Sequence, residues 1–364
     1  MLSILALAGL AATALAAPAS QSGCTFTDAN AAIKGKASCS NIVLQNISVP
    51  AGVTLDLTDL NSGTNVTFQG KTSFGYKEWL GPLIAVSGSN INVVGAPGNL
   101  IDCGGQRWWD GKGGNGGKIK PKFFAAHDLQ DSNIRNLNVL NTPVQAFSIN
   151  TCTNLGIYNI IIDDSAGDNG PNGAHNTDGF DVGSSNGVHI SGCIVKNQDD
   201  CLAINSGTNI TFTNGTCIGG HGLSVGSVGD RKNNVVETIR IINSVITESV
   251  NGIRIKTIAG AIGSVTDVLY SGITMSGISC FGIIVQQDYK NGVPTGKPTS
   301  GVPITNLNIT GITGNVKPSG TNIQILCGSK GCRNWNLNAI NLSGGQQSAK
   351  PINAPPGALQ SMNS

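Results

Sequence analysis

Short runs of alternating apolar and polar residues recur along this chain of 364 residues, and turn residues separate them. Each run has two apolar positions that alternate with polar ones, a two-residue gap, and then two further apolar positions. The copies begin at Leu155, Val188, Ile239, Val268, Leu307 and Trp335, with weaker copies at Ile91, Ser132 and Ile210. No copy has a long stretch with the 3.6-residue period of an amphipathic helix, so the pattern predicts short strands.

The spacing of the copies indicates a repeat architecture. From Ser132 onward the starts differ by 23, 33, 22, 29, 29, 39 and 28 residues, so insertions extend a minimum near 22. Such strands cannot bury an apolar face alone, but stacked repeats share one core. We therefore expect an all-β, single-domain parallel β-helix of about ten coils. A β-sandwich or barrel is the alternative, although its hairpins would not require this spacing.

The N-terminal end of the predicted solenoid should carry a helical cap. Residues 26–36 form the best helix candidate, with Thr27 or Asp28 as the N-cap. Solenoids need such a cover because the open first coil would otherwise expose its core. Two segments, residues 104–122 and 288–303, are rich in glycine and interrupt the repeat, so we expect them to be loops.

Composition and the N-terminal residues limit the possible functions. Glycine accounts for 50 residues and charged residues for 12%, which suits strands and turns. The net charge of +2 and the lack of a basic stripe argue against nucleic-acid binding. Residues 1–20 are expected to be a signal peptide, with room for a short propeptide after it, because the apolar run is too short for a membrane anchor. We therefore expect a secreted protein whose residues 21–364 form one domain.

The cysteines agree with an oxidising compartment. All ten follow the predicted signal peptide, and secreted chains favour disulfides. Short separations make three pairs plausible, Cys24 with Cys39, Cys201 with Cys217, and Cys327 with Cys332, although connectivity cannot be deduced from sequence. No Cys-x-x-Cys or paired histidine spacing indicates zinc. Glycosylation sequons occur at Asn46, Asn65, Asn209, Asn214, Asn308 and Asn341.

The strongest chemical signal is a set of acids and one histidine at near-equal spacing. Asp178 lies 22 residues before Asp200, and His221 lies 21 residues after it. Equivalent residues of neighbouring coils stack roughly 4.8 Å apart in a parallel β-helix, so these three should share one lateral position. Clustered carboxylates suit glycoside hydrolysis, which needs one protonated and one ionised acid.

Each part of this set also has a less specific interpretation. An isolated Asp-Asp pair is more often a solvated turn, which is our interpretation of Asp163 and Asp164. For Asp199 and Asp200 the registered Asp178 favours a catalytic site, because crowded like charges raise the pKa of one member. His221 lies between two glycines, where it either fills a structural role or orients and shares a catalytic proton.

Two cations follow at alternating positions. Arg254 and Lys256 should point to the same face of one strand. A solvated strand face is the less specific interpretation. In a chain with so few charges, a cation pair beside three acids instead favours a substrate that carries carboxylates. Residues 111–116 match the dinucleotide fingerprint as a pattern, but they lack its βαβ context.

Taken together, these residues resemble glycoside hydrolase family 28, and specifically the secreted fungal endopolygalacturonases. The motifs that carry the resemblance are Asn176-Thr177-Asp178, Asn197-Gln198-Asp199-Asp200-Cys201, Gly220-His221-Gly222 with Ser224, Arg254-Ile255-Lys256, and Tyr289 in Gln287-Asp288-Tyr289. Each motif is weak alone, but their order and spacing are specific and span nearly all of the mature chain.

The resemblance implies inverting endo-hydrolysis of the α-1,4 bonds of polygalacturonic acid on a right-handed parallel β-helix, with no metal or other cofactor. Its implied catalytic residues are Asp199 as general acid, Asp178 and Asp200 as water activators, and His221 as support for the acid's protonation. Its implied substrate-binding residues are Asn176, Arg254, Lys256 and Tyr289. Closely stacked carboxylates would by distance alone suggest retention, and we follow the family here.

The resemblance also implies a monomer that binds pectin, no membrane contact, and plant inhibitor proteins as protein partners. Three alternatives stay open. A hydrolase of rhamnogalacturonan or xylogalacturonan is the nearest. A pectate lyase would need calcium and a basic residue that abstracts a proton. A β-helical carbohydrate-binding protein would have no use for a shared proton on Asp178, Asp199 and Asp200.

Overall fold

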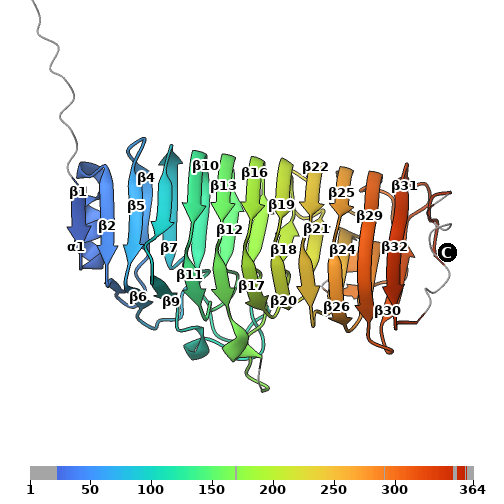
Figure 1. The fold of residues 1–364 in the computed structure, drawn as a ribbon, viewed down its shortest axis with the longest axis horizontal. Coiled ribbons are helices and arrows are strands. Elements are labelled where there is room, and N and C mark those ends of the chain that lie inside the picture. The colour runs from blue at the N-terminus through green and yellow to red at the C-terminus, as the bar shows by residue number, and fades with distance from the viewer. Residues whose placement is uncertain (1–22, 169, 291, 347–350, 357, 359–364) are drawn as a thin grey trace, which may run out of the picture.

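The chain is wound into one elongated parallel β-helix, with its N-terminal coil at one end and its C-terminal coil at the other (Figure 1). The computed structural model describes residues 23–168, 170–290, 292–346, 351–356 and 358. The expected all-β, right-handed β-helix is confirmed. The predicted signal peptide, residues 1–20, lies outside the described residues. No helix in the described ranges is long and apolar enough to cross a membrane.

Three ladders of parallel strands form the walls of the solenoid. The first ladder contains β1 (Gly23–Phe26), β2 (Asn41–Gln45), β5 (Asn65–Gln69), β8 (Asn92–Gly95), β10 (Phe124–Arg135), β13 (Thr153–Tyr158), β16 (Ser185–Ser191), β19 (Gly207–Thr213), β22 (Val235–Ile242), β25 (Ser264–Ser271), β29 (Ile304–Val316), β31 (Cys332–Arg333) and β32 (Asn336–Ser343). The second ladder contains β4 (Leu55–Leu60), β7 (Ile84–Ser89), β10, β12 (Phe147–Asn150), β15 (Phe180–Gly183), β18 (Leu202–Ile204), β21 (Leu223–Val228), β24 (Asn251–Ile258), β27 (Phe281–Lys290) and β30 (Thr321–Leu326). The third ladder contains β3 (Ser48–Val49), β6 (Lys71–Phe74), β9 (Leu100–Asp102), β11 (Asn138–Leu140), β14 (Ile161–Asp163), β17 (Ile194–Asn197), β20 (Thr216–Gly219), β23 (Val245–Thr247), β26 (Thr274–Ile278) and β29.

Few other elements interrupt this pattern. The short strand β28 (Val293–Pro294) folds back on the end of β27 as an antiparallel hairpin. Among the described residues, 3₁₀ turns lie at η1 (Lys36–Ser38), η2 (Gly105–Arg107) and η3 (Ser165–Gly167). The last two occur where loops leave the solenoid.

The stacking register confirms the repeat that the apolar pattern predicted. In the first ladder, the starts of six copies pair with one another in succession, namely Leu155, Val188, Ile210, Ile239, Val268 and Leu307. All six side chains are at most 1% exposed. Each apolar position therefore packs on its equivalent in the next coil, and the column forms one continuous core.

Asparagine makes many of the turns between strands. Asn136 and Asn159 occupy neighbouring coils with φ values of 58° and 53°, in the left-handed region that asparagine tolerates better than other side chains. The Nδ2 atom of Asn159 donates to the Oδ1 atom of Asn136 at 3.3 Å. This stacking explains why a chain of short strands is so rich in asparagine and glycine.

The predicted N-terminal cap and disulfides are present. Helix α1 (Ala29–Gly35) begins after Asp28, whose Oδ1 atom accepts a hydrogen bond from the Ala31 amide at 2.8 Å. The three plausible disulfides form, with Cys24 bonded to Cys39, Cys201 to Cys217, and Cys327 to Cys332. The other four cysteines, Cys103, Cys152, Cys193 and Cys280, are free thiols.

The solvated turn expected at Asp163 and Asp164 was wrong. Asp164 is fully buried, and its carboxyl oxygens accept hydrogen bonds from the Thr142 amide at 2.6 Å and the Thr142 hydroxyl at 2.7 Å. Asp163 forms an ion pair with Lys196 at 2.9 Å. Burial raises the pKa of Asp164 to about 7 despite the donors from Thr142. The preceding coil supplied Thr142 and the next coil supplied Lys196, partners that the sequence did not reveal.

Candidate active site

The second ladder brings the predicted acids and the histidine to one lateral position. In this ladder Phe180 pairs with Leu202, and Leu202 pairs with Leu223. Asp178, Asp200 and His221 each lie two residues before these partners, so they occupy consecutive coils in register. Backbone hydrogen bonds continue the pairing here, from the Gly179 amide to the Asp200 carbonyl at 2.9 Å and from the Cys201 amide to the Gly222 carbonyl at 2.9 Å. The predicted stacking is confirmed.

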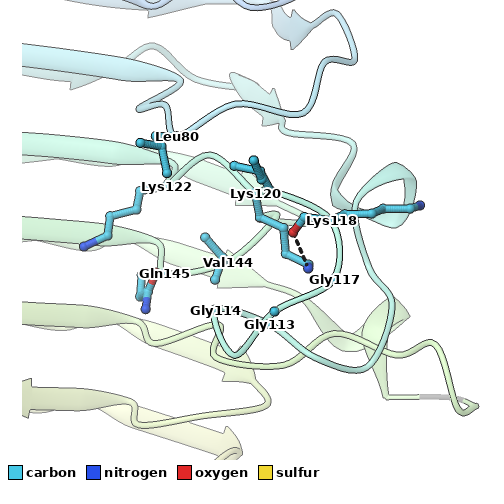
Figure 2. Close-up of a pocket in the computed structure, with 11 residues that line it drawn as sticks. Leu80, Gly113, Gly114, Gly117, Lys118, Lys120, Lys122, Val144 and Gln145 are labelled. Atoms are coloured by element: carbon cyan, nitrogen blue, oxygen red, sulfur yellow. Dashed lines mark hydrogen bonds between the residues drawn. The ribbon is translucent and has the colours of Figure 1, made fainter.

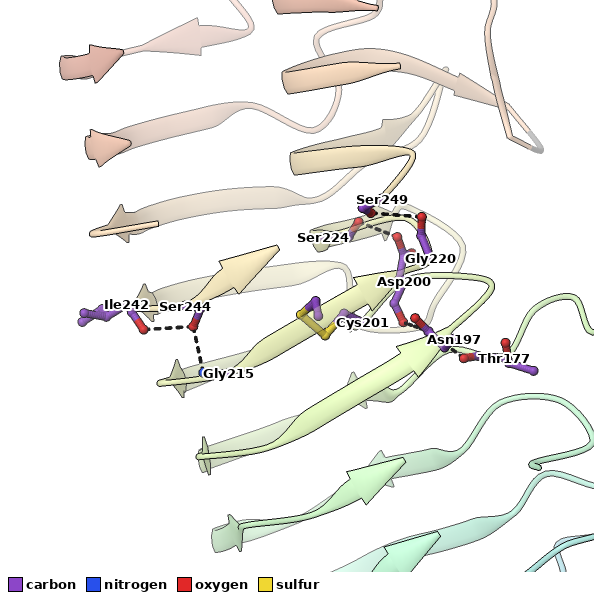
Figure 3. The surroundings of a disulfide bond; sticks show 11 residues. Thr177, Asn197, Asp200, Cys201, Gly215, Gly220, Ser224, Ile242, Ser244 and Ser249 are labelled. Carbon is purple, nitrogen blue, oxygen red and sulfur yellow. Dashed lines mark hydrogen bonds between the residues drawn. A yellow bond between two sulfur atoms is a disulfide. The ribbon is translucent and has the colours of Figure 1, made fainter. Parts of the chain in front are cut away.

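Buried amides and a disulfide hold the segment that carries the two adjacent acids. The Nδ2 atom of Asn197 donates to the Thr177 carbonyl at 2.7 Å and to the Asp200 carbonyl at 3.0 Å. Figure 3 shows both of these hydrogen bonds, next to the disulfide between Cys201 and Cys217. Gln198 accepts from the Thr177 hydroxyl at 2.8 Å. The backbone at Asp200 is thus fixed on both sides, which restricts where its side chain can point.

Asp199 accepts hydrogen bonds from three donors. Its Oδ1 atom lies 2.8 Å from the Asp200 amide and 3.0 Å from Nδ1 of His221, and its Oδ2 atom accepts from Nδ2 of Asn176 at 2.8 Å. Burial would raise the pKa of Asp199, but the hydrogen bond and charge of His221 outweigh it and lower this pKa. Burial alone would lower the pKa of His221. The hydrogen bond and the negative charge of Asp199 outweigh burial, so the pKa of His221 is raised. The pair therefore holds one proton.

The two glycines beside His221 allow it to approach Asp199. Gly220 and Gly222 have φ values of +60° and +84°, where other residues are strained. A Cβ atom on Gly220 would lie 2.3 Å from the Asp199 carbonyl oxygen, and one on Gly222 would lie 2.2 Å from the Asn251 carbonyl oxygen. Any larger residue would push the histidine segment away from the neighbouring coils.

Asp200 is an anchored carboxylate. Its Oδ1 atom accepts from the Ser224 hydroxyl at 2.6 Å, and its Oδ2 atom accepts from Nζ of Lys256 at 2.6 Å. The residue is only 1% exposed. Burial alone would lower the pKa of Lys256, but the charge of Asp200 raises it, so the ammonium is protonated. The sequence missed Ser224's role, although its outward position between two core residues could have indicated it.

Asp178 differs from its two neighbours in its electrostatics. It is half-buried, and burial together with the charges of Asp199, Asp181 and Asp200 raises its pKa well above the ordinary range. Environments that push the pKa values of neighbouring acids apart are typical of acid and base pairs. The cluster can therefore hold a proton and a charge at the same time.

Asp181 is a fourth acid on this face, which the sequence analysis did not single out. It lies between Phe180 and Val182, which are both fully buried, so its side chain points outward. Burial raises its pKa to about 7, although the charge of Lys122 acts in the opposite direction. Its alternation with core residues was the signal in the sequence.

The two cations point out of strand β24, as predicted, because Ile253 and Ile255 fill the core. The guanidinium carbon of Arg254 lies 5.3 Å from the centre of the Tyr289 ring, and Nζ of Lys256 lies 5.4 Å from it. Tyr289 thus joins the cluster from strand β27, which ends in the β28 hairpin.

Arg254 lacks a counter-ion. It is 8% exposed, its Nε atom is buried without a hydrogen-bond partner, and no acid within the described ranges forms an ion pair with it. A desolvated guanidinium is costly unless something pairs with it, so this position suits an anionic ligand. Gln286 pairs with Lys256 in the next coil, and both of its buried amide atoms also lack partners. The sequence analysis missed Gln286, which follows a core valine.

Ligand atoms of Asp199, Asp200 and His221 lie within 4.8 Å of one another, a grouping that can hold a metal ion. The donor set does not fit one well. The Lys256 ammonium is already 2.6 Å from Asp200, and Ser224 occupies the other oxygen. A cation would have to displace a protonated lysine, so we derive no step through a metal.

Comparison with known proteins identifies the family. Residues 39–361 match the family described as glycosyl hydrolases family 28. The chain is 62% identical to endopolygalacturonase 1 of Colletotrichum lindemuthianum, over 97% of both chains. It is 57% identical to a polygalacturonase of Cochliobolus carbonum, over 98% of this chain and 97% of the other. These likenesses extend over almost the whole length.

Solved structures agree with the sequence relatives. Endopolygalacturonase I from Stereum purpureum, complexed with two galacturonate molecules, is 39% identical and superposes with a TM-score of 0.83, over 91% of this chain and 98% of the other. An endo-xylogalacturonan hydrolase from Aspergillus tubingensis shares the fold at 23% identity, with a TM-score of 0.76 over 93% and 97% of the two chains. The chain belongs to glycosyl hydrolases family 28.

Proposed function

We propose that this protein is an endopolygalacturonase, which hydrolyses internal α-1,4 bonds of polygalacturonate. The observation that carries the proposal is the stack of Asp178, Asp200 and His221, with Asp199 bonded to His221, together with Arg254 on the next coil, a desolvated cation that has no ion-pair partner in the described ranges. Acids that hold a proton and a charge suit glycoside cleavage. A buried unpaired guanidinium suits a sugar that carries a carboxylate. The relatives named endopolygalacturonase 1 and polygalacturonase agree with cleavage of a glycoside and with a sugar that carries a carboxylate.

Asp199 is the general acid in this proposal. It gives a proton to the glycosidic oxygen as the bond from that oxygen to the anomeric carbon breaks. In the free enzyme the proton of the pair lies toward His221, whose Nδ1 atom is 3.0 Å from Asp199. His221 passes this proton to Asp199 when the glycosidic oxygen arrives. Asn176 holds the other oxygen of Asp199 in place at 2.8 Å.

Asp178 is the general base. A carboxyl with a raised pKa is a stronger base once it has lost its proton. Asp178 and Asp181 both have raised pKa values, and Asp178 is the one that lies in register with Asp200. It takes a proton from the water that attacks the anomeric carbon. Asp200, held by Lys256 and Ser224, lies beside the developing oxocarbenium ion and helps to orient the water. Attack from the face opposite the leaving group inverts the anomeric centre.

Arg254 and Tyr289 hold the galacturonate next to the cleaved bond. The guanidinium binds the sugar carboxylate, and the ring of Tyr289 covers the cation. Lys256 contributes with donor hydrogens that Asp200 leaves free, since an ammonium has three. Asn176 acts chiefly by donating a hydrogen bond to Asp199. This role is narrower than the substrate-binding role that the resemblance implied.

The same proposal includes secretion. The three disulfides suit an oxidising compartment, and residues 1–20 would be removed as a signal peptide so that residues 21–364 form the mature catalytic domain. Sequencing the N-terminus of protein recovered from culture medium tests this; an intact Met1 would contradict it. Monomeric state and binding of plant inhibitor proteins belong to the proposal on family grounds.

One assay tests the function. De-esterified polygalacturonate is treated in EDTA while viscosity, reducing ends and ultraviolet absorbance are followed together. The proposal predicts a steep viscosity fall with few reducing ends and no unsaturated product. Reducing ends without viscosity loss would indicate exo action. Absorbance that appears only after calcium is added would indicate a lyase. No reaction either in EDTA or after calcium is added would favour the rhamnogalacturonan or binding-protein alternatives.

A further inference from the structure

The structure separates the six glycosylation sequons by what their side-chain amides do. The Nδ2 atoms of Asn65 and Asn209, which would carry the sugar, each donate to the Oδ1 atom of an asparagine on the preceding coil, at 3.0 Å and 2.9 Å. Asn308 is half-buried on strand β29, and its Oδ1 atom is buried. The amides of these three sequons therefore face the protein.

Asn214 has a different environment. It is exposed at the turn between strands β19 and β20, with a φ of 53°, and no described residue forms a hydrogen bond with its Nδ2 atom. Its backbone amide donates to the Ile242 carbonyl on the next coil at 3.1 Å. The amide of Gly215 donates to the Ser244 hydroxyl at 3.1 Å, a contact visible in Figure 3. The next coil thus fixes the turn and leaves the side-chain amide unused.

A stripe of exposed aliphatic side chains lies beside this turn. Thr216, the last residue of the Asn214 sequon, pairs with Ile194 on the preceding coil and with Val245 on the next. Ile194 pairs in turn with Ile161. All three aliphatic residues are exposed, and they extend across three coil spacings, or about 14 Å. Single exposed apolar residues are ordinary, but a contiguous row indicates a surface that something covers.

Two other sequons are exposed but have polar neighbours. Ser48, the last residue of the Asn46 sequon, pairs with Ser73. The last residue of the Asn341 sequon, which is also a serine, pairs with Asn315. The aliphatic stripe therefore sets the sequon at the β19–β20 turn apart from these two.

We propose that Asn214 carries an N-linked glycan and that its first sugars lie on the stripe of Ile161, Ile194 and Val245. The new bond joins Nδ2 to the anomeric carbon of an N-acetylglucosamine. The donor is a lipid-linked oligosaccharide diphosphate, whose lipid diphosphate leaves while Nδ2 loses one proton. The C–H face of a pyranose ring can then remove aliphatic area from water. The inference depends on the secretion that the proposed function includes.

A glycan at Asn214 starts outside the catalytic groove. Asn214 precedes its third-ladder strand, β20, whereas His221 follows that strand. Asn214 lines neither the cavity of about 270 Å³ beside the glycine-rich residues 113–117 (Figure 2) nor the hollow of about 380 Å³ beside His221. Turnover of the substrate should therefore not depend on this glycan.

The site is tested on wild-type protein secreted from a eukaryotic host. Peptide N-glycosidase in heavy-oxygen water converts a glycosylated asparagine to a labelled aspartate, which peptide mass spectrometry then locates. The proposal predicts the label at Asn214 and none at Asn209, five residues earlier on the same coil. An unlabelled Asn214 would overturn the inference.

Two matched variants test whether the glycan covers the stripe. Asn214→Gly and Asn209→Gly each remove a sequon at a residue with a positive φ, 53° and 55°, which glycine accepts. Asn214→Gly should lose the mass of one oligosaccharide, bind several-fold more of an apolar fluorescent dye, and keep its kcat and KM on polygalacturonate. Asn209→Gly should match wild type in mass and in dye binding. Thr216→Ser should keep the glycan, because serine also completes the sequon.

Two further results would overturn the inference. Equal dye binding by wild type and Asn214→Gly would show that the sugars do not cover the stripe. A protein that has no sugar at Asn214 and elutes as a dimer would indicate that a second copy of the chain covers it. Neither readout uses catalysis, so wild-type protein that carries the glycan but cleaves no galacturonan would overturn the proposed function alone.

Discussion

The Nδ1 atom of His221 lies 3.0 Å from the Oδ1 atom of Asp199, and the two side chains hold a single proton between them. Neither the imidazole nor the carboxylate can be assigned a protonation state without the other. The acid of this site is therefore a pair, in which the histidine stores the proton that the aspartate delivers.

The first prediction is a bell-shaped dependence of kcat/KM on pH. Asp178 must lose its proton to act as base, and its raised pKa puts the acidic limb above the ordinary aspartate value of about 4. The His221–Asp199 pair must keep its proton, and the raised pKa of His221 puts the alkaline limb above about 6.5.

His221→Ala should move the alkaline limb to lower pH, because Asp199 would then have to keep the proton alone. His189→Ala, which changes a half-buried histidine on strand β16, is the control and should leave both limbs in place. An alkaline limb that stays where it is in His221→Ala would show that the pair does not share the catalytic proton.

The second prediction contrasts the two cations of strand β24. Lys256→Met leaves Asp200 buried without its counter-ion, and the free energy of unfolding should fall by about 3–5 kcal/mol. Arg254→Met removes a buried cation that has no acid partner in the described ranges, so stability should not fall. Its KM for polygalacturonate should rise at least tenfold, or about 1.4 kcal/mol. Urea unfolding and initial rates measure both effects; equal losses of stability would contradict this division of roles.

The third prediction concerns Asn176. Asn176→Gly removes the donor to Asp199 but keeps a residue that accepts the φ of 53°. A hydrogen bond to a charged group contributes about 1.5–3 kcal/mol, so kcat should fall about tenfold to a hundredfold. Asn159→Gly has the same φ of 53° and lies outside the groove, and it should keep full activity. A raised KM with an unchanged kcat would instead mean that Asn176 acts on substrate alone.

The fourth prediction concerns stability and the buried Asp164. Its pKa is raised to about 7, so the folded state keeps a proton that the unfolded state loses near pH 4. Its contribution to stability is complete below about pH 4 and is lost as the pH rises to about 7. Asp164→Asn cannot ionise, so the variant should lose part of this pH dependence and be more stable than wild type near neutrality. Thermal unfolding across this range measures it; parallel curves for the two proteins would refute the assignment.

Much of this arrangement could be predicted from sequence because a solenoid converts spacing into position. The interval between Asp178 and Asp200 equals one minimal coil, and the alternation of Arg254 with Lys256 fixes their common face. The register between coils then follows from apolar residues such as Leu155 and Val188, which can only stack in one way.

Contacts between non-equivalent positions could not be predicted in this way. Lys256 reaches back to Asp200, so a cation expected to bind substrate is largely committed to the protein. Asn176 contacts Asp199 and a distant glycine-rich segment because the insertion at 104–122 folds over the groove. Asp164 is buried because Thr142 on the preceding coil supplies two donors. Each depends on side-chain reach and loop paths, which residue spacing does not encode.

The most direct test of the account is the turnover of Asp199→Asn on de-esterified polygalacturonate at about pH 5, between the ordinary carboxyl and imidazole pKa values. Asp164→Asn, a second buried acid changed in the same way, is the matched control. The account predicts that both variants fold and that Asp164→Asn cleaves the polymer like wild type. Asp199→Asn should lose nearly all viscosity reduction while still binding the polymer. Near-normal cleavage by a folded Asp199→Asn would contradict the central claim that this carboxyl delivers the proton.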